Sequence, residues 1–233
     1  MAEGKRFSDA LTFDNGDLEV DATALRNFFV GKRNPNYQFQ IERFVTQSRK
    51  GCPDVMRAHA RVLGICQRGG FTALKVLPFR FVAKNGVPPV ENTEEVMNSG
   101  LLQRITKPGK CVLFTDGATS YKDALKKIKM RIQHRRAIHA KKQWSVKTRT
   151  KAGHSKVAGT MCIDAQWKSM KKFIHPSVKS TCHFVFNENL WRHMWHWLHR
   201  FNRQYSRVQL FLELGRLAKK SKCPQVPKKA LLR

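Results

Sequence analysis

The stretch Lys110–Tyr121, KCVLFTDGATSY, decides how we expect this chain to fold. Its apolar part, Cys111–Phe114, is followed by Thr115–Gly117, a pattern typical of a buried strand that ends in a turn. A helical pattern begins at Tyr121. Open α/β sheets bind ligands beyond the carboxyl ends of their strands, so Asp116 is a candidate site residue. The alternative is an ordinary turn or helix-capping aspartate.

Three strands are expected ahead of this stretch. Asp17–Thr23 (DLEVDAT) alternates apolar and acidic residues as a strand does, with its two internal acids on one face. Ala58–Gln67 and Thr72–Ala83 are apolar runs on either side of Arg68–Gly70, which predicts a hairpin. The first part of the domain is therefore expected to be three antiparallel strands.

Helices and one further strand are expected after the hairpin. Asn92 or Thr93 is a candidate cap for a helix over Glu94–Ile105. The segment Lys126–Lys151 is strongly basic, and a short strand is predicted within it near Ala137–Val146. Together with the strand that ends at Asp116, these elements predict a single α/β domain with a mixed five-stranded sheet.

The segment Val157–Ile174, VAGTMCIDAQWKSMKKFI, has the periodicity of an amphipathic helix. Asp164 lies beside its apolar stripe, and Lys171 follows two helical turns later on the same face as Asp164. The alternative is an exposed charge pair of no functional importance. The residues expected to face the core are Ile163, Trp167, Met170 and Ile174.

The charge of the chain predicts a polyanionic partner. The 233 residues include 45 Lys and Arg against 16 Asp and Glu, a formal net charge of +29. Phosphates of nucleic acid attract such a surplus because their neutralisation releases counterions. A membrane partner is not expected, since no apolar run approaches the roughly 18 residues of a spanning helix and no basic amphipathic segment stands out.

Cysteine usage and the N-terminal sequence predict an intracellular protein. The six cysteines form no CxxC pair, and we expect reduced thiols. No zinc site is expected, because Cys182, His183 and His175 have poor spacing for metal ligands. The N-terminus lacks the apolar region of a secretory signal. The predicted location is the nucleus in a eukaryotic host, and otherwise the cytoplasm or nucleoid.

Five segments resemble the DDE/DDD transposases of bacterial insertion sequences and the related Merlin-type elements of eukaryotes. The family pattern is a strand aspartate, a second aspartate in a strand–Asp–Gly–x–x–x–Tyr turn, and an acid–x–x–Trp helix that carries a lysine. The resemblance covers most of the chain, from Val20 to about Arg203. The segments are LEVDATALR (18–26), RVLGICQRGG (61–70), CVLFTDGATSY (111–121), IDAQWKSMKKFI (163–174) and NLWRHMWHWLHRFNRQ (189–204).

The resemblance implies an RNase H-like fold and two-metal-ion chemistry on DNA. Asp21, Asp116 and Asp164 would be the catalytic acids and the ligands of two Mg²⁺ or Mn²⁺ ions, with Asp21 shared between the ions. Two divalent cations activate the nucleophile and stabilise the leaving oxygen, and hard cations select carboxylate oxygens. Glu19 is an adjacent competitor for the first position. Lys171 would contact a DNA phosphate.

Two departures from the family pattern stand out. The third acid is Asp164, where many relatives carry Glu. The DNA-binding region that usually precedes the catalytic domain is not expected here, because Asp21 comes almost at once. A truncated, decayed or domesticated copy is therefore one interpretation of the sequence.

Further basic residues are candidate DNA contacts, and the expected partners are the ends of the element and a target duplex, with a homodimer left open. A family histidine shortly before the third acid has two candidates, His134 and His139. The candidate DNA contacts besides Lys171 are Lys168, Lys172, Arg135, Arg136, Lys141 and Lys142.

We expect residues 17–205 to form the catalytic domain, with an N-terminal extension over 1–16 and a C-terminal helix and basic tail over 206–233. Asn187–Arg203 is predicted as a helix that packs across the sheet, although Trp191 and Trp195 among cations also fit a base-stacking platform. Val208–Leu217 is predicted as a second amphipathic helix. The tail Lys219–Arg233 is expected to be disordered, and a nuclear address and a DNA-backbone contact are two candidate roles for it.

Two other functions compete with a transposase. A catalytically inactive nucleic-acid-binding protein would keep the basic surface without an assembled acidic site. A ribosome-associated basic protein would explain the charge, but not the strand and helix aspartates.

Overall fold

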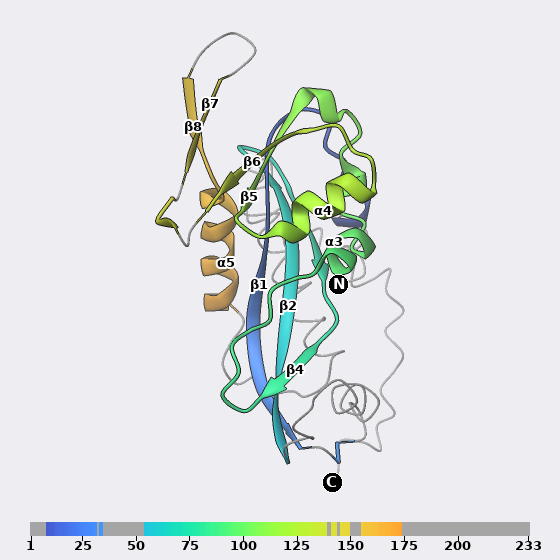
Figure 1. Cartoon of the computed structure of the whole chain (residues 1–233), viewed down its shortest axis with the longest axis vertical. Helices are drawn as coiled ribbons and strands as arrows, with labels where there is room; N and C mark the ends of the chain where they lie inside the picture. Colours follow the sequence, from blue (N-terminus) through green and yellow to red (C-terminus); the bar gives the residue numbers. More distant parts are fainter. Residues whose placement is uncertain are drawn as a thin grey trace, which may run out of the picture. The chain divides into compact units, whose positions relative to one another are not determined.

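A six-stranded mixed sheet lies at the centre of the structure, a computed structural model (Figure 1). The structure describes residues 8–31, 33–34, 54–138, 141–143, 145–149 and 155–173. The predicted helices at 187–203 and 208–217 lie outside these residues. In the described part the chain is an α/β fold whose sheet is flanked by helices, as the sequence predicted.

Five strands form a continuous path in the order β3-β2-β1-β5-β6, and β4 pairs with β2 beside that path. The first three strands of the path are antiparallel, as predicted, whereas β5 and β6 both run parallel to β1. The sheet therefore has one strand more than predicted. The strand bounds are β1 Gly16–Gly31, β2 Val55–Gln67, β3 Thr72–Val76, β4 Arg80–Ala83, β5 Cys111–Asp116 and β6 Gln133–Ala137.

The additional strand arises because the predicted run Thr72–Ala83 is divided. β3 pairs with the C-terminal half of β2, and β4 pairs with its N-terminal half. Pro78 lies between them and has no N–H to donate to a sheet ladder, so the chain leaves the sheet there and enters it again.

β1 is longer than predicted and continues to Gly31 beyond its alternating part. A register shift between Ala24 and Arg26 interrupts the pairing with β2, which breaks the two-residue periodicity that a sequence pattern can detect. β5 pairs with β1 only from Gly16 to Val20. The site residue Asp21 is therefore the first residue of β1 beyond its pairing with β5.

The predicted cap at Asn92 is confirmed, but the predicted length of its helix is wrong. The helix α3 spans Thr93–Asn98, and Asn92 and Glu95 form a reciprocal capping box. The chain turns away after Asn98 because Gly100 adopts a positive φ of 72°. Two 3₁₀ turns follow, at Leu102–Arg104 and Pro108–Lys110.

The remaining elements are two longer helices, the edge strand β6 and a second, small sheet. Helix α4 spans Thr119–Lys127, close to its predicted position. Helix α5 spans Met161–Phe173, so its predicted start at Val157 is wrong, because Val157 lies in a strand; the predicted core residue Ile174 lies outside the described residues. The strand predicted near 137–146 is instead β6, which ends at Ala137. An additional two-stranded sheet, β7 (Val146–Arg149) with β8 (Ser155–Ala158), was not predicted. The two strands are short and contain lysine and arginine with few apolar residues. Their sequences therefore lack the apolar alternation that predicts a strand.

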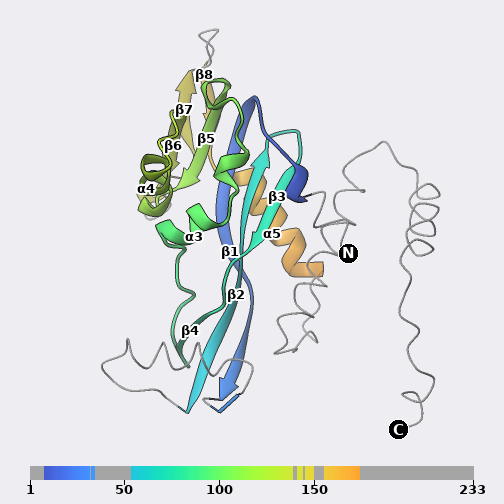
Figure 2. The same cartoon turned by 90° about the vertical axis from the view of Figure 1, so that its right-hand side faces the viewer.

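The helices cover opposite faces of the sheet, with α3 and α4 on one side and α5 on the other (Figure 2). The core on the α3 and α4 side includes Leu18, Val20, Leu63, Leu113 and Tyr121. On the other side, Ile163, Trp167 and Met170 of α5 are buried, as predicted. A Cβ at Gly64 of β2 would lie 2.7 Å from the Trp167 ring, so glycine is what lets α5 pack this closely.

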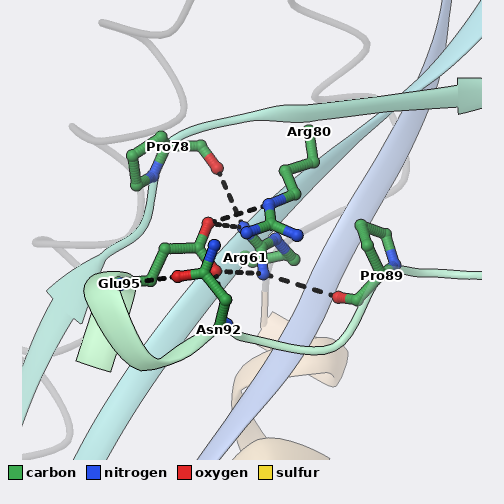
Figure 3. Close-up of polar contacts among 6 residues, drawn as sticks. All are labelled: Arg61, Pro78, Arg80, Pro89, Asn92 and Glu95. Carbon is green, nitrogen blue, oxygen red and sulfur yellow. Dashed lines mark hydrogen bonds and ion pairs between the residues drawn. The ribbon is translucent and has the colours of Figure 1, made fainter. Parts of the chain in front are cut away.

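A buried ion-pair network fastens α3 to β2 (Figure 3). Arg61 of β2 is 2% exposed and forms ion pairs with Glu95 of α3, which also accepts from Arg80 Nε at 3.0 Å. The Arg61 guanidinium also donates to the carbonyl oxygens of Pro78 and Pro89, each at 3.4 Å. The network therefore ties both ends of the segment between β3 and α3 to the sheet.

Candidate active site

The three aspartates predicted as catalytic come from three different elements. Asp21 lies on β1, Asp116 is the last residue of β5, and Asp164 lies in the first turn of α5. The charges of Asp116 and Asp164 both raise the pKa of Asp21. The fold therefore brings the three acids into one electrostatic neighbourhood, although they are far apart in the sequence.

The pKa of Asp21 is strongly perturbed. Burial raises the pKa of Asp21 to about 8, and the charges of Asp116, Asp164 and Glu91 add to that effect. A hydrogen bond to Asp21 Oδ2 from Trp167 Nε1, 2.8 Å away, acts in the opposite direction. This bond also fixes the carboxyl group of β1 against helix α5.

Asp116 stabilises a turn, which is the structural role that the sequence analysis gave as the alternative to a catalytic role. Its Oδ1 accepts a hydrogen bond from the backbone N–H of Ala118 at 3.0 Å, which shapes the turn before α4. The side chain is half-buried. A single accepted hydrogen bond leaves a carboxylate with further lone pairs, so the turn role and a ligand role are compatible.

Asp164 and Lys171 both lie on the exposed side of α5, as the helical spacing predicted. Asp164 Oδ2 accepts a hydrogen bond from the Thr160 hydroxyl, 3.2 Å away. The candidate DNA contacts Lys168 and Lys172 are exposed on the same helix. The third acid is therefore the most accessible of the three, and it is next to a row of cations.

Glu19, the competitor for the first position, has a structural role. It is fully buried, and its Oε2 accepts from the backbone N–H groups of Cys162 and Ile163 at 2.7 and 3.0 Å. Its Oε1 accepts from Arg68 Nε at 2.7 Å, and Arg68 also donates to the carbonyl of Gly159. Glu19 therefore holds the N-terminus of α5 on β1, a favourable position for a carboxylate.

Glu91 is a fourth acid near the site that sequence reasoning missed. It lies in the irregular segment before α3 and is 8% exposed. Burial raises the pKa of Glu91, and the charge of Asp116 raises it further. No periodicity surrounds this residue in the sequence, so nothing local indicated that the side chain would be buried or would face β1 and β5.

No three His, Cys, Asp or Glu side chains in the described ranges converge closely enough to surround a metal ion. The three predicted ligands are each held by a different donor: Trp167 for Asp21, Ala118 for Asp116 and Thr160 for Asp164. The acids thus share an electrostatic neighbourhood without forming a closed coordination shell.

The other predicted DNA contacts lie on β6 and the turn after it. Arg135, Lys141 and Lys142 are exposed, and Arg136 is half-buried. Lys147 on β7 is also exposed. These cations lie on β6 or follow it in the chain, whereas the lysines of α5 are on the helix that carries Asp164.

His134 of β6 is positioned beside β5, whereas His139, the other histidine considered, lies outside the described residues. The His134 Nε2 and the Thr115 hydroxyl are 2.8 Å apart. Burial, followed by the charges of Arg136 and Lys122, lowers the pKa of His134 to about 4. The imidazole is therefore neutral at physiological pH and supports the strand that ends at Asp116.

Three cysteines of the described residues, Cys66, Cys111 and Cys162, take part in no disulfide. Within the same part of the chain, no helix combines the length and the apolar character that crossing a membrane would require.

The raised pKa of Asp21 predicts an unusual pH dependence of stability. A carboxyl whose pKa is about 8 when folded and 3.8 when unfolded favours folding at low pH. That contribution is fully present below pH 3.8 and is lost as the pH rises to about 8. Without metal, Asp21→Asn should therefore be more stable than the wild type at pH 8, by roughly 2–4 kcal/mol.

The measurement is urea unfolding of both proteins in EDTA between pH 4 and pH 8. The difference in unfolding free energy between the two proteins should grow steadily across this range. Only the wild type has the buried carboxyl group of Asp21, whose ionised form destabilises the folded state as the pH rises. A difference that does not change with pH would show that Asp21 titrates normally in the folded protein.

Comparison with known proteins gives no match: no family model, no curated protein and no solved structure is similar to this chain.

Proposed function

We propose that this protein is a metal-dependent DNA transposase, or a descendant of one, with an RNase H-like catalytic domain. The observation that carries the proposal is that Asp21 of β1, whose pKa is raised by burial, also lies close enough to Asp116 of β5 and Asp164 of α5 for their charges to raise it further. A buried carboxyl group with a perturbed pKa, beside other carboxylates at a strand end, is typical of catalytic sites.

The sheet supports the fold part of this proposal. Three antiparallel strands are followed by two strands parallel to the first, in the order β3-β2-β1-β5-β6. A final helix, α5, packs against β1 and carries the third acid. This agrees with the mixed five-stranded RNase H-like sheet implied by the resemblance, and β4 is an addition to it.

The acids fit two divalent cations by their chemistry. Burial and the charges of Asp116, Asp164 and Glu91 are the causes that raise the pKa of Asp21. Gathered carboxylates are the donors that Mg²⁺ and Mn²⁺ prefer. Asp21 would be shared by both ions, with Asp116 on one and Asp164 on the other.

The bound ions would activate the attacking water or 3′ hydroxyl and stabilise the leaving oxygen. The chain itself positions the carboxylates: Trp167 orients Asp21, and Glu19 holds the helix that bears Asp164. The exposed Lys171, two turns beyond Asp164, would bind a DNA phosphate close to the scissile bond.

A cleavage assay on labelled duplex oligonucleotides tests the proposal. We expect Mg²⁺- or Mn²⁺-dependent nicking that leaves 3′ hydroxyl ends, with no products in EDTA. The assay should include a pool of random duplexes, because the terminal sequence is unknown. Absence of nicking with both metals, from protein that binds the same duplexes, would contradict the enzyme proposal.

The second candidate is a catalytically inactive nucleic-acid-binding protein. The observation that favours it is that no three of the described acidic, histidine or cysteine side chains close around an ion site. In this case the basic surface would act alone, and the acids would only shape turns and helix ends.

Both candidates predict DNA binding that weakens steeply with salt. If six phosphates are contacted, a slope of about −0.9 per contact implies roughly a thousandfold or greater loss of affinity between 50 and 200 mM salt. Fluorescence anisotropy with duplexes of unrelated sequence measures this loss. Little preference among sequences is expected, and an affinity independent of salt would contradict the prediction.

A further inference from the structure

The last turn of helix α4 and the connection from it to β6 carry a group of exposed cations. Ile128 and Met130 of this segment pack against the core, and the charged residues around them face solvent. Within the described part of the chain, these cations take part in no ion pair. We call them the α4 basic surface, and its residues are Lys126, Lys127, Lys129 and Arg131.

Several other cations of the described residues are neutralised by acids. Arg61 pairs with Glu95, and Arg68 pairs with Glu19, and both pairs hold elements of the fold together. The dipole of α4 favours the two lysines of its last turn, but this effect fades beyond the helix end and does not account for Arg131. The charge of the α4 basic surface is therefore available to a polyanionic partner.

Lys129 occupies a backbone position that usually belongs to glycine. Its φ is 54°, in the left-handed region. The N–H of Lys129 donates to the carbonyl of Lys126 at 3.1 Å, and the N–H of Met130 donates to that of Leu125 at 3.0 Å. These two bonds form a helix end in which glycine is the least strained residue at position 129. A lysine there is expected where its charge is used, since strained residues gather at functional sites.

The α4 basic surface and the lysines of α5 lie on opposite sides of the sheet (Figure 2). Leu18 and Val20 of β1 belong to the same core as Tyr121 of α4. Glu19, between them in the strand, accepts hydrogen bonds from the first turn of α5. Neighbouring residues of a strand point to opposite faces, so the sheet separates the two groups of cations.

We propose that the α4 basic surface binds the phosphate backbone of a second nucleic-acid segment, separate from the segment at α5. The protein would then hold two duplexes together, one on each side of its sheet. Contacts from lysine and arginine to phosphates position a duplex without reading its bases, so this binding should not depend on sequence. The inference rests on the nucleic-acid partner that both candidate functions share, and it requires no metal.

Energy transfer between two short duplexes, one labelled with a donor and one with an acceptor, tests the inference in EDTA. The variant combines Lys126→Gln, Lys127→Gln and Arg131→Gln in the full-length protein. We expect its energy-transfer signal to fall at least fivefold, while anisotropy still shows binding of a single duplex. The matched control removes three exposed cations elsewhere, so its net charge is the same, and it should bridge like the wild type. Its substitutions are Lys84→Gln, Lys107→Gln and Lys110→Gln.

Lys129→Gly separates binding from stability. Glycine relieves the strained φ, so the Tm should rise by about 2–4 °C. The same change removes one cation from the α4 basic surface, so the energy-transfer signal should fall by about twofold. A lower Tm together with unchanged bridging would mean that Lys129 has a structural role, and it would overturn the place of this residue in the surface.

The outcomes separate this inference from the proposed function. If the wild type binds duplex but does not bridge two of them, or if the triple variant bridges like the wild type, the second site is wrong and the proposed function stands. If the triple variant binds no duplex at all, both faces serve one segment and the inference fails. If the wild type binds no duplex, the inference and the proposed function both fail.

Discussion

Replacing Asp116 by Asn should abolish strand cleavage while leaving DNA binding intact. The carboxylate is a proposed metal ligand, whereas the proposed DNA contacts are basic side chains that this change leaves in place. We expect a loss in cleavage rate of about a thousandfold or more, which corresponds to roughly 4 kcal/mol of transition-state stabilisation. The measurement is cleavage of labelled duplex in Mg²⁺, with anisotropy binding to the same duplex in EDTA.

The fold and the stability of the Asp116→Asn variant should be preserved. The amide oxygen of Asn can still accept the hydrogen bond from the backbone N–H of Ala118. Removing one of several neighbouring negative charges should leave the metal-free protein equally or slightly more stable. Added Mg²⁺ should then raise the Tm of the wild type and have much less effect on the variant.

The matched control is Asp123→Asn, which removes an exposed acid from α4 and should cleave DNA and respond to Mg²⁺ like the wild type. A purely structural role for Asp116 predicts a different pattern. The variant would then keep the turn hydrogen bond and its stability, and Mg²⁺ would shift the Tm of both proteins equally.

Replacing Glu95 by Ala should cause the largest loss of stability. The change leaves Arg61 buried at 2% exposure without its carboxylate partner, and it removes the capping box at the start of α3. Breaking a buried pair by removing one partner costs about 3–5 kcal/mol. Urea unfolding monitored by circular dichroism should show this loss as a lower midpoint.

Two variants make this experiment specific. Glu94→Ala removes the exposed neighbouring acid in the same helical turn and should change stability by less than about 0.5 kcal/mol. Glu95→Gln keeps an acceptor for Arg61 and for the Asn92 backbone, so we expect an intermediate loss. Equal losses in Glu94→Ala and Glu95→Ala would mean that neither the ion pair nor the capping box of Glu95 contributes to stability.

The parts of the fold predicted well from the sequence are those where one residue pattern determines one element. The apolar run before Asp116 formed β5, the Arg68–Gly70 turn formed a hairpin, and the cap at Asn92 formed as predicted. Helix α5 also presented Trp167 inward and Lys171 outward, because helical spacing alone sets those faces.

The parts predicted poorly depend on contacts between distant segments. Nothing near Glu19 in the sequence shows that its carboxylate caps α5, because the cap joins two distant segments. The burial of Glu91 depends in the same way on Arg61 holding Pro89. The helix predicted to reach Ile105 ended at Asn98, where Gly100 turns the chain. The expectation that Asp21, Asp116 and Asp164 share one site came from the family resemblance and not from local periodicity.

The mixed direction of the sheet has a consequence for the order in which the protein folds. β2 and β3 are joined by a tight turn and pair near it, whereas β1 pairs with β5 through residues as distant as Gly16 and Cys111. Closing long loops is entropically costly, so we expect the parallel pairing to form after the hairpin. Since only this late pairing brings Asp21 beside Asp116, the acidic site should exist only in chains that have completed folding, and nascent or partly folded chains should be unable to cut DNA.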